Sequence, residues 1–275
     1  MVLIGLGTTG SNIVKKFNDR YKKITIKAGS EIPKFPSPEE YEESLPDLSE
    51  LLKFEEDECY FFVCGAEKIS SASLRLLETI KDKKINIVYV YPEEILLSPL
   101  QKKTNKVIFN VLQEYTRSGL FNSMWLFSNE EISKAIPSIT MDNMWDMINS
   151  AIVNAMENVL HYRGNDPVIG SHHDQKDISR ILTVEYGEFE KNEKKLYFLL
   201  DNITETCYIN IVSNEEMKSN KNLLNVLKEK IVENQEKKID SSFAVFKSEY
   251  EQSFYYAIHF THYLQETTEK NKKNT

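Results

Sequence analysis

Hydrophobic and polar positions follow two different rhythms along the first half of the chain. Short apolar or alternating runs are typical of buried strands, and they stand at residues 2–4, 23–27, 59–64, 85–91 and 123–127. Helical spacing of apolar residues is found between these runs, at residues 11–21, 69–81 and 103–116. A short helix is also expected at 48–54, with Asp47 as its N-cap. This order of strands and helices predicts a parallel sheet with helices on both faces.

The longest helical pattern covers residues 140–162 and carries a wide apolar stripe that includes Met144, Ile152 and Met156. A helix of about 20 residues spans roughly 30 Å, which is enough to connect two domains. After a polar segment at 164–176, strands are expected at 181–186, 196–200, 207–212, 243–247 and 253–263, and a helix at 223–234. This second part predicts an α+β module with a mixed or antiparallel sheet.

The predicted organisation is therefore an α/β protein with a Rossmann-like, parallel-sheet domain at residues 1–139. A central connecting helix at 140–163 leads to a smaller α+β domain at 164–265. Residues 266–275 are charged and lack apolar anchors, so this tail is expected to be disordered.

Composition narrows the classes of function. The 34 basic and 42 acidic residues give a net charge of -8, which argues against general nucleic-acid binding. No apolar run has the length of a membrane helix and no signal peptide is recognised, so we expect no membrane insertion and a cytoplasmic location. The three cysteines, Cys59, Cys64 and Cys207, lack metal-ligand spacing, and Cys59 and Cys64, in or beside a predicted buried strand, are interpreted as small hydrophobes.

A glycine-rich loop follows the first strand directly. It reads Gly5-Leu6-Gly7-Thr8-Thr9-Gly10 and leads into a helical pattern. A strand, a glycine turn and a helix N-terminus together favour anion binding, because free N–H groups and the helix dipole point at the same place. The loop therefore predicts phosphate or nucleotide contact, although a tight turn without a ligand would use the same glycines.

Two nucleotide folds compete for this loop. The G-x-G-x-x-G spacing fits an NAD(P)-dependent oxidoreductase, which needs an acidic residue about 20 positions further on to bind the ribose. After the second strand the chain offers only Glu31 for that role.

The second alternative matches more of the chain. The segment Ile4-Gly5-Leu6-Gly7-Thr8-Thr9-Gly10-Ser11-Asn12 resembles the first nucleotide loop of the tubulin/FtsZ superfamily, which in FtsZ runs I-G-V-G-G-x-G-G-N. Three further strands match elements of the family in the family's own order. They are the strand that ends at Gly65, the strand with its terminal Pro92 and the strand that closes on Asn129. The long helix resembles the family's central helix, and the later elements follow the order of its C-terminal domain.

The resemblance implies binding of GTP or GDP, with Mg²⁺ as a further candidate, and it implies self-association into filaments. The residues that it places at the nucleotide are Gly5, Gly7, Thr8, Thr9, Gly10, Ser11, Asn12, Gly65, Asn129 and Asp146. Several have alternative roles: Asn12 as a first-turn polar residue, Asn129 as a helix cap and Asp146 as part of a polar face. Asn143 and Asn149 are rivals of Asp146, one turn away.

Catalysis is expected from the loop His172-His173-Asp174-Gln175-Lys176-Asp177, which is similar to the family's N-x-D-x-x-D. The resemblance implies that Asp174 and Asp177 orient the attacking water at the nucleotide of the adjacent subunit. Acidic pairs are also common in exposed loops. The two histidines next to Asp174 could suggest a metal, but adjacent side chains in an extended segment point apart, and we expect no metal site.

One segment departs from the family pattern. The signature G-G-G-T-G-[ST]-G should follow Gly65, but the chain continues Ala66-Glu67-Lys68-Ile69-Ser70 and carries an acidic residue where phosphate should lie. Three hypotheses follow: an assembly-dependent GTPase, an FtsZ-like structural or partner-binding protein without GTP turnover, and an NAD(P)-dependent oxidoreductase. For the first two, a plasmid or phage origin and an adaptor partner are further expectations.

Overall fold

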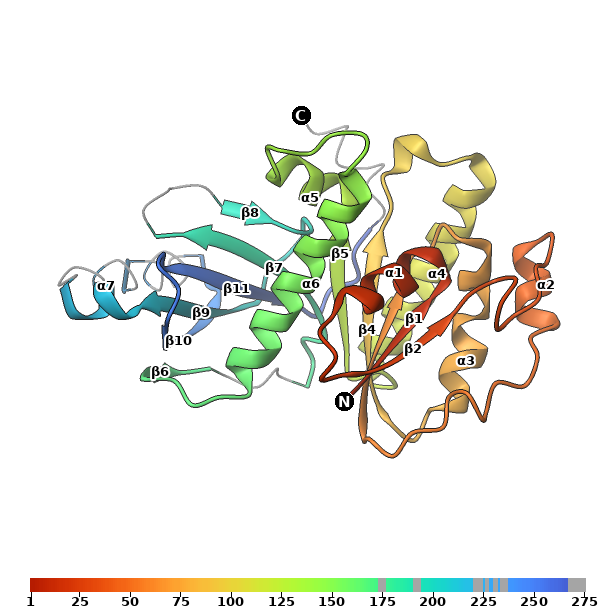
Figure 1. The fold of residues 1–275 in the computed structure, drawn as a ribbon, viewed down its shortest axis with the longest axis horizontal. Coiled ribbons are helices and arrows are strands. Elements are labelled where there is room, and N and C mark those ends of the chain that lie inside the picture. Colours follow the sequence, from red (N-terminus) through yellow and green to blue (C-terminus); the bar gives the residue numbers. More distant parts are fainter. Residues whose placement is uncertain are drawn as a thin grey trace.

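The computed structural model describes residues 1–172, 177–189, 194–219, 225, 228–229, 232 and 237–266. Within these residues one 11-stranded sheet runs through the whole molecule (Figure 1), in the order β2-β1-β3-β4-β5-β7-β11-β9-β10-β6, and β8 pairs with β7. None of the helices in this part of the chain combines the length and the apolar character needed to cross a membrane.

The first five strands form the predicted parallel sheet. They are β1 (Val2–Leu6), β2 (Lys22–Ile26), β3 (Glu58–Val63), β4 (Lys84–Tyr91) and β5 (Ser123–Ser128). All neighbouring pairs are parallel, so their carboxyl ends lie on one edge of the sheet and their amino ends on the other. Strands β1, β3, β4 and β5 are almost wholly buried, as their apolar sequences require.

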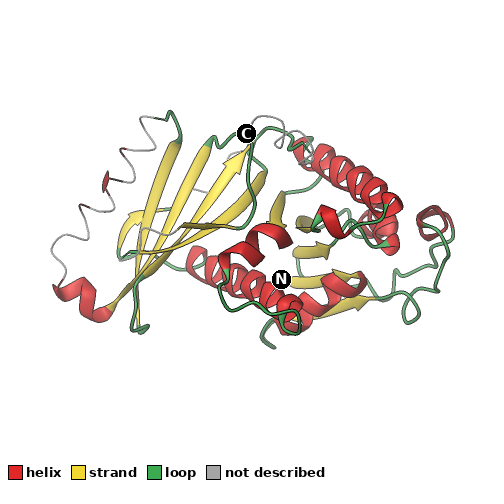
Figure 2. Ribbon diagram, turned by 90° about the horizontal axis from the view of Figure 1, so that it is seen from above, coloured by secondary structure: helices red, strands yellow, loops and turns green. Residues whose placement is uncertain are grey.

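Helices cover both faces of these strands (Figure 2). Side chains of α1 (Gly7–Lys16) and α6 (Met144–Arg163) share one core with the sheet, and side chains of α3 (Ser73–Thr79) and α4 (Pro99–Arg117) share the other. Helix α4 begins at Pro99 because Ser98, its N-cap, and Gln101 form a capping box and proline is favoured at the first helical position. Two 3₁₀ turns, η1 (Lys68–Ala72) and η2 (Glu94–Leu96), precede α3 and α4.

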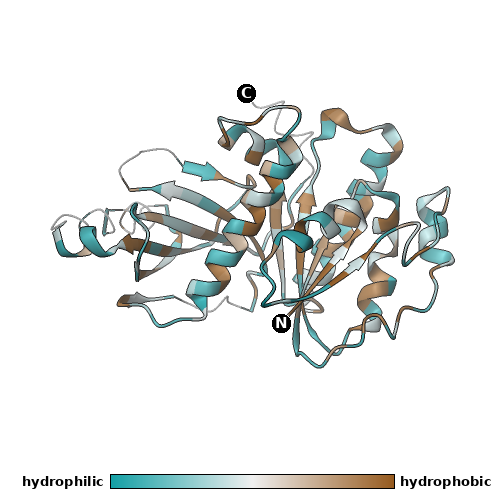
Figure 3. Cartoon of the chain, viewed as in Figure 1, coloured by the Kyte–Doolittle hydropathy of each residue, from teal (hydrophilic) through white to brown (hydrophobic). Residues whose placement is uncertain are grey.

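The second half of the sheet is mixed, as predicted. It consists of β6 (Ile169–Ser171), β7 (Ile181–Glu188), β8 (Lys194–Leu196), β9 (Glu205–Ser213), β10 (Asp240–Ser248) and β11 (Phe254–Thr261). Strands β9 and β10 are parallel, whereas β11 is antiparallel to both β7 and β9. Figure 3 shows apolar colour concentrated in the central strands and polar colour on the outer helix α2 (Pro38–Glu43).

The two halves join through backbone pairing. Met124 and Trp125 of β5 pair in parallel with Ile181 and Leu182 of β7. The Thr183 hydroxyl donates to the Leu126 carbonyl oxygen over 2.9 Å and extends this junction. The sheet is therefore continuous past the predicted boundaries, and the division into domains at 1–139 and 164–265 stays a prediction.

Several predicted elements differ from the structure. Residues 48–54 form a single turn and no helix: Asp47 accepts a hydrogen bond from the Ser49 amide at 2.9 Å, as an N-cap would, and the Leu52 amide donates to the Leu48 carbonyl at 2.9 Å, but the turn does not continue. The predicted strand at 196–200 is displaced to β8, while α2 and β6 were not predicted. Helix α1 begins earlier than expected and ends at Lys16. Most of the predicted helix at 223–234, and residues 267–275 of the predicted tail, lie outside the described residues.

Candidate functional site

The glycine loop leads from β1 straight into α1, because the helix begins at Gly7. Close packing explains two of its glycines. A Cβ on Gly5 would lie 2.5 Å from the Gly10 carbonyl oxygen, and a Cβ on Gly10 would lie 2.3 Å from that of Phe62. Gly7 has a φ of 74°, which L side chains rarely adopt. The three glycines therefore hold the start of α1 against β1 and β3.

A carboxylate from a distant part of the chain occupies the N-terminus of α1. The Thr8 amide donates to Glu67 Oε2 at 2.7 Å, and the Thr9 amide donates to Glu67 Oε1 at 2.8 Å. The N-cap residue Leu6 has no side chain that could do this, and no acidic residue lies in the first turn of α1. Both oxygens of Glu67 thus bind the amides that an external anion would use.

The backbone around Glu67 is fixed by its own short loop. The Glu67 amide donates to the Cys64 carbonyl, and the Ser70 amide and hydroxyl both donate to the Glu67 carbonyl. Ser70 is fully buried and also bonds the Gly65 carbonyl. Lys68 points elsewhere, since its ammonium donates to the Pro36 carbonyl at 2.6 Å. The helix N-terminus, and not Lys68, is therefore the partner of the Glu67 charge.

Gly65 has a packing role in the structure. A Cβ there would lie 1.8 Å from the Tyr89 hydroxyl, which is itself buried and donates to Asn105 Oδ1 at 2.7 Å. Beside it, burial and the nearby Glu67 carboxylate raise the pKa of the Cys64 thiol to about 12. Cys64 is a neutral, buried group, as predicted for Cys59 and Cys64, and all three cysteines are free and buried.

The next loop residues point in different directions. Ser11 is fully buried and its hydroxyl donates to the Gly5 carbonyl at 3.1 Å, so it braces the loop from within. Asn12 is exposed, and its side-chain oxygen accepts a hydrogen bond from the Lys27 ammonium at 3.4 Å. Asn12 is thus available at the surface on the first helix, whereas Ser11 is not.

The two predicted base contacts lie at the N-termini of α5 (Asn129–Ala135) and α6. Asn129 is buried as the first residue of α5, and the capping role belongs to Ser128, whose hydroxyl accepts from the Glu131 amide at 3.3 Å. Asp146 lies in the first turn of α6, where its carboxylate pairs with the Lys16 ammonium at 2.5 Å. Asp146 therefore ties α6 to α1.

Three rival candidates have local roles. Asn143 stands at the N-cap position of α6, and its side-chain oxygen accepts from the Thr140 amide at 2.7 Å. Asn149 is buried within α6. Glu31, the ribose candidate of the oxidoreductase hypothesis, accepts a hydrogen bond from the Lys27 amide at 2.8 Å and closes the turn after β2.

Asp177, the described member of the predicted catalytic pair, lies at the opposite edge of the sheet. Asp177 is exposed and lines a polar hollow of about 450 Å³ together with Glu58, Lys84 and Ser123, the first residues of β3, β4 and β5. Its carboxylate lies 3.6 Å from the Arg180 guanidinium. Asp174 and His173 lie outside the described residues. Asp177 and the glycine loop are therefore not brought together within one chain.

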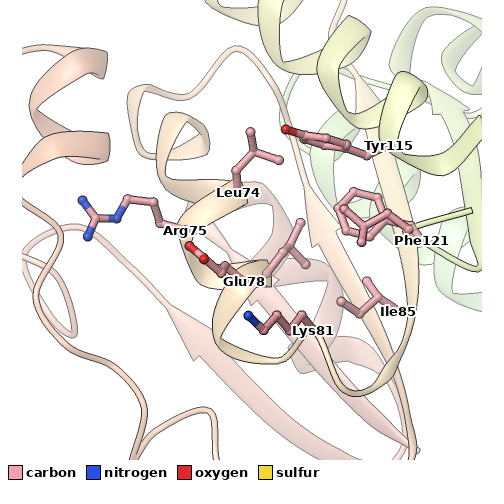
Figure 4. Close-up of a pocket in the computed structure, with 9 residues that line it drawn as sticks. Leu74, Arg75, Glu78, Lys81, Ile85, Tyr115 and Phe121 are labelled. Carbon is pink, nitrogen blue, oxygen red and sulfur yellow. The ribbon is translucent and has the colours of Figure 1, made fainter. Parts of the chain in front are cut away.

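A second hollow was not predicted. It measures about 390 Å³ and lies between α3 and the end of α4 (Figure 4). Its apolar wall consists of Leu74, Leu77, Ile85, Tyr115, Leu120 and Phe121. Among the described residues no group of three or more His, Cys, Asp or Glu side chains is arranged to hold a metal ion.

Comparison by sequence gives no relative: no family model matches, and no curated protein matches. Comparison by structure matches nearly the whole chain. An empty FtsZ dimer of M. jannaschii has a TM-score of 0.68 at 11% identity, covering 94% of this chain and 88% of that one. A GTPγS-form protofilament of TubZ from Bacillus thuringiensis serovar israelensis has 0.71 at 12%, covering 94% and 86%.

CetZ2 from Haloferax volcanii, described as a GTPγS-bound protofilament, has a TM-score of 0.67 at 12% identity and covers 99% of this chain and 95% of that one. This chain thus has the tubulin/FtsZ fold, and the resemblance predicted from its motifs is confirmed at the level of the fold. One part of the site was only half anticipated: Glu67 was recognised as an adverse charge, but not as a partner of the glycine loop.

Proposed function

We propose that this chain self-associates head to tail, as a filament-forming protein of tubulin/FtsZ fold, in the cytoplasm. One observation carries the proposal: the glycine loop follows the carboxyl end of β1, while Asp177 lies beside the amino ends of β3, β4 and β5. Because the strands are parallel, these two parts of the predicted site lie on opposite edges of the sheet. Only a second copy, stacked along the strand direction, would bring Asp177 to a glycine loop.

The similar structures support this proposal by their descriptions. TubZ and CetZ2 are described as protofilaments with GTPγS. An open-ended head-to-tail contact generates a filament, because each copy leaves one free surface of each kind.

The hypothesis of assembly without GTP turnover is the one that the contacts favour. The amides of Thr8 and Thr9 already bind Glu67, and the second glycine-rich loop is missing. Asp177, the described half of the predicted catalytic pair, is compatible with either form, since an exposed carboxylate can orient a water molecule or contribute to charge complementarity at an interface. The oxidoreductase hypothesis has less support, because Glu31 is engaged in its own turn.

The test is sedimentation and electron microscopy of the purified chain over a range of concentrations, with and without GTP, beside a phosphate-release assay. We expect pelleted filaments above a threshold concentration in both conditions, and phosphate release at the background level. A chain that stays monomeric throughout contradicts self-association. GTP-dependent phosphate release that rises with assembly would instead support the GTPase hypothesis.

Charge reversal at Asp177 tests whether the edge at the amino ends of β3, β4 and β5 forms the interface. Asp177→Lys should shift the threshold concentration about tenfold, because reversing one charge at a contact changes the free energy of association by about 1.4 kcal/mol. Glu39→Lys is the matched control, since Glu39 is also exposed but lies on the outer helix α2. Equal thresholds for the two variants would place the contact elsewhere.

A further inference from the structure

We propose that Glu67 is the built-in anionic ligand of the glycine loop, holding the place of a phosphate group and excluding external phosphates from it. The proposal deepens the function proposed above, since it makes self-association independent of a nucleotide. Its core, the exclusion of anions, concerns a single chain and can be tested without assembly.

The contact has the form of ligand binding. Two consecutive amides of the first turn of α1 each bind a different oxygen of the same carboxylate, at 2.7 and 2.8 Å. Such distances are those of charge-assisted hydrogen bonds. The carboxylate also lies on the positive end of the helix dipole, which favours negative charge there. Glu67 thus satisfies the donors that would otherwise be open to an anion.

The loop is shaped around this carboxylate. A Cβ on Gly7 would lie 2.5 Å from Glu67 Oε2 and 2.8 Å from its Cδ, so only glycine lets the side chain approach. The same glycine that would allow a phosphate close to the backbone therefore allows Glu67 close to it.

Glu67 is also delivered from a rigid base. Its amide and carbonyl are both hydrogen-bonded within the segment from Cys64 to Ser70. Gly65, two residues earlier, packs against the buried hydroxyl of Tyr89. The side chain is half-buried, and no ion pair with Lys68 draws it away, because Lys68 bonds the Pro36 carbonyl. An incoming phosphate would have to displace a pre-positioned carboxylate and would meet its negative charge.

The experiment compares wild type with Glu67→Ala and Glu67→Gln by isothermal titration calorimetry, using inorganic phosphate and GTP as separate probes. Wild type should show no saturable heat at millimolar probe. Glu67→Ala should bind both probes at least about tenfold more tightly than wild type, because the two amides are freed. Glu67→Gln should fall between them, since its amide oxygen still accepts one hydrogen bond without the charge.

The matched control is Glu157→Ala. Glu157 is a carboxylate that also accepts a hydrogen bond from a backbone amide, that of Asn18 at 2.9 Å, but Asn18 lies beyond the far end of α1. Glu157→Ala should leave probe binding unchanged. Wild type that binds phosphate as well as Glu67→Ala does would overturn the proposal, and so would a folded Glu67→Ala chain that binds neither probe; its thermal unfolding transition shows whether it is folded.

Failure of the proposed function would look different. If no variant sediments, but Glu67→Ala gains phosphate binding, the exclusion of anions stands and self-association falls. If wild type sediments without GTP and its affinity for phosphate equals that of Glu67→Ala, self-association stands and the role of Glu67 falls.

Discussion

The loops after β1 and β3 leave the same edge of the sheet on neighbouring strands, and they differ in what each supplies. The first keeps three glycines and presents backbone amides. The second keeps one glycine and presents a carboxylate, Glu67, to those amides. In a phosphate site built from two glycine-rich loops, both loops would supply backbone amides to the ligand. Here the first loop supplies the amides and the second supplies the carboxylate that they bind.

The glycines of the two loops are required for different structural reasons. In the first loop Gly10 is required by the backbone of β3, and Gly7 by a carboxylate. In the second loop Gly65 is required by a side chain, Tyr89. A glycine-rich first loop therefore does not by itself imply a bound phosphate. Four substitutions test this comparison, from the largest expected effect on stability to the smallest.

Gly10→Ala should have the largest effect. The new Cβ would lie 2.3 Å from the Phe62 carbonyl oxygen, and a strand backbone cannot move aside cheaply. We expect a loss of about 3 kcal/mol in the free energy of unfolding, measured by urea denaturation, although alanine is the better helix former. Gly164→Ala is the control, because its nearest atoms are at 3.5 Å, and it should change stability by no more than about 0.5 kcal/mol.

Gly65→Ala should cost about 2 kcal/mol, because its Cβ would meet side-chain atoms of Tyr89 and Asn105 and no backbone atom is among its nearest contacts. The double variant with Tyr89→Phe tests the cause. Removing the hydroxyl removes the closest clash at 1.8 Å, so the cost of Gly65→Ala should fall in that background. Additive effects in this double-mutant cycle would show that Gly65 is needed for another reason.

Glu67→Ala should cost about 1–2 kcal/mol, since a helix loses the acceptor of two of its first amides. Hydrogen exchange gives a local readout: the amides of Thr8 and Thr9 should exchange faster, while those in the middle of β1 stay protected. Unchanged exchange at both threonines would contradict the contact.

Asp146→Ala should have the smallest effect, about 0.5 kcal/mol. The Asp146 side chain is 68% exposed, and surface ion pairs such as the one with Lys16 contribute little. Thermal unfolding of Asp146→Ala, Lys16→Ala and the double variant measures the pair. A gain in GTP binding by Glu67→Ala that is lost when Asp146 is also removed would instead support the predicted base contact.

The sequence was sufficient for the fold because strong apolar runs mark β1, β3, β4 and β5, and the stripe of α6 is long and regular. It was insufficient for short elements. Asp47 accepts from the Ser49 amide as an N-cap would, but residues 48–54 continue for only one turn. Strand β6 is only three exposed residues at the sheet edge, which is too short for an alternating pattern.

The residues of the candidate site stay predictions, and the contacts that the structure shows among them were not predictable from the sequence. Gly5, Gly7 and Gly10 follow from spacing alone. The partnership between Glu67 and Thr8 crosses 59 positions of sequence, and only the pairing of β1 with β3 brings them together. Asp177 was predicted to act between chains, and its place at the far edge of the sheet agrees with that geometry, while its catalytic role stays a prediction.

The attachment of Glu67 to the backbone has a consequence for regulation. A ligand that is part of the chain acts at an effective concentration on the order of millimolar or above, and it cannot be diluted, consumed or exchanged. The state of a loop that is occupied by Glu67 does not depend on the concentration of nucleotide in the cell. If assembly needs no nucleotide, as proposed above, the amount of the chain, set by its synthesis and degradation, determines through mass action whether assembly starts or stops.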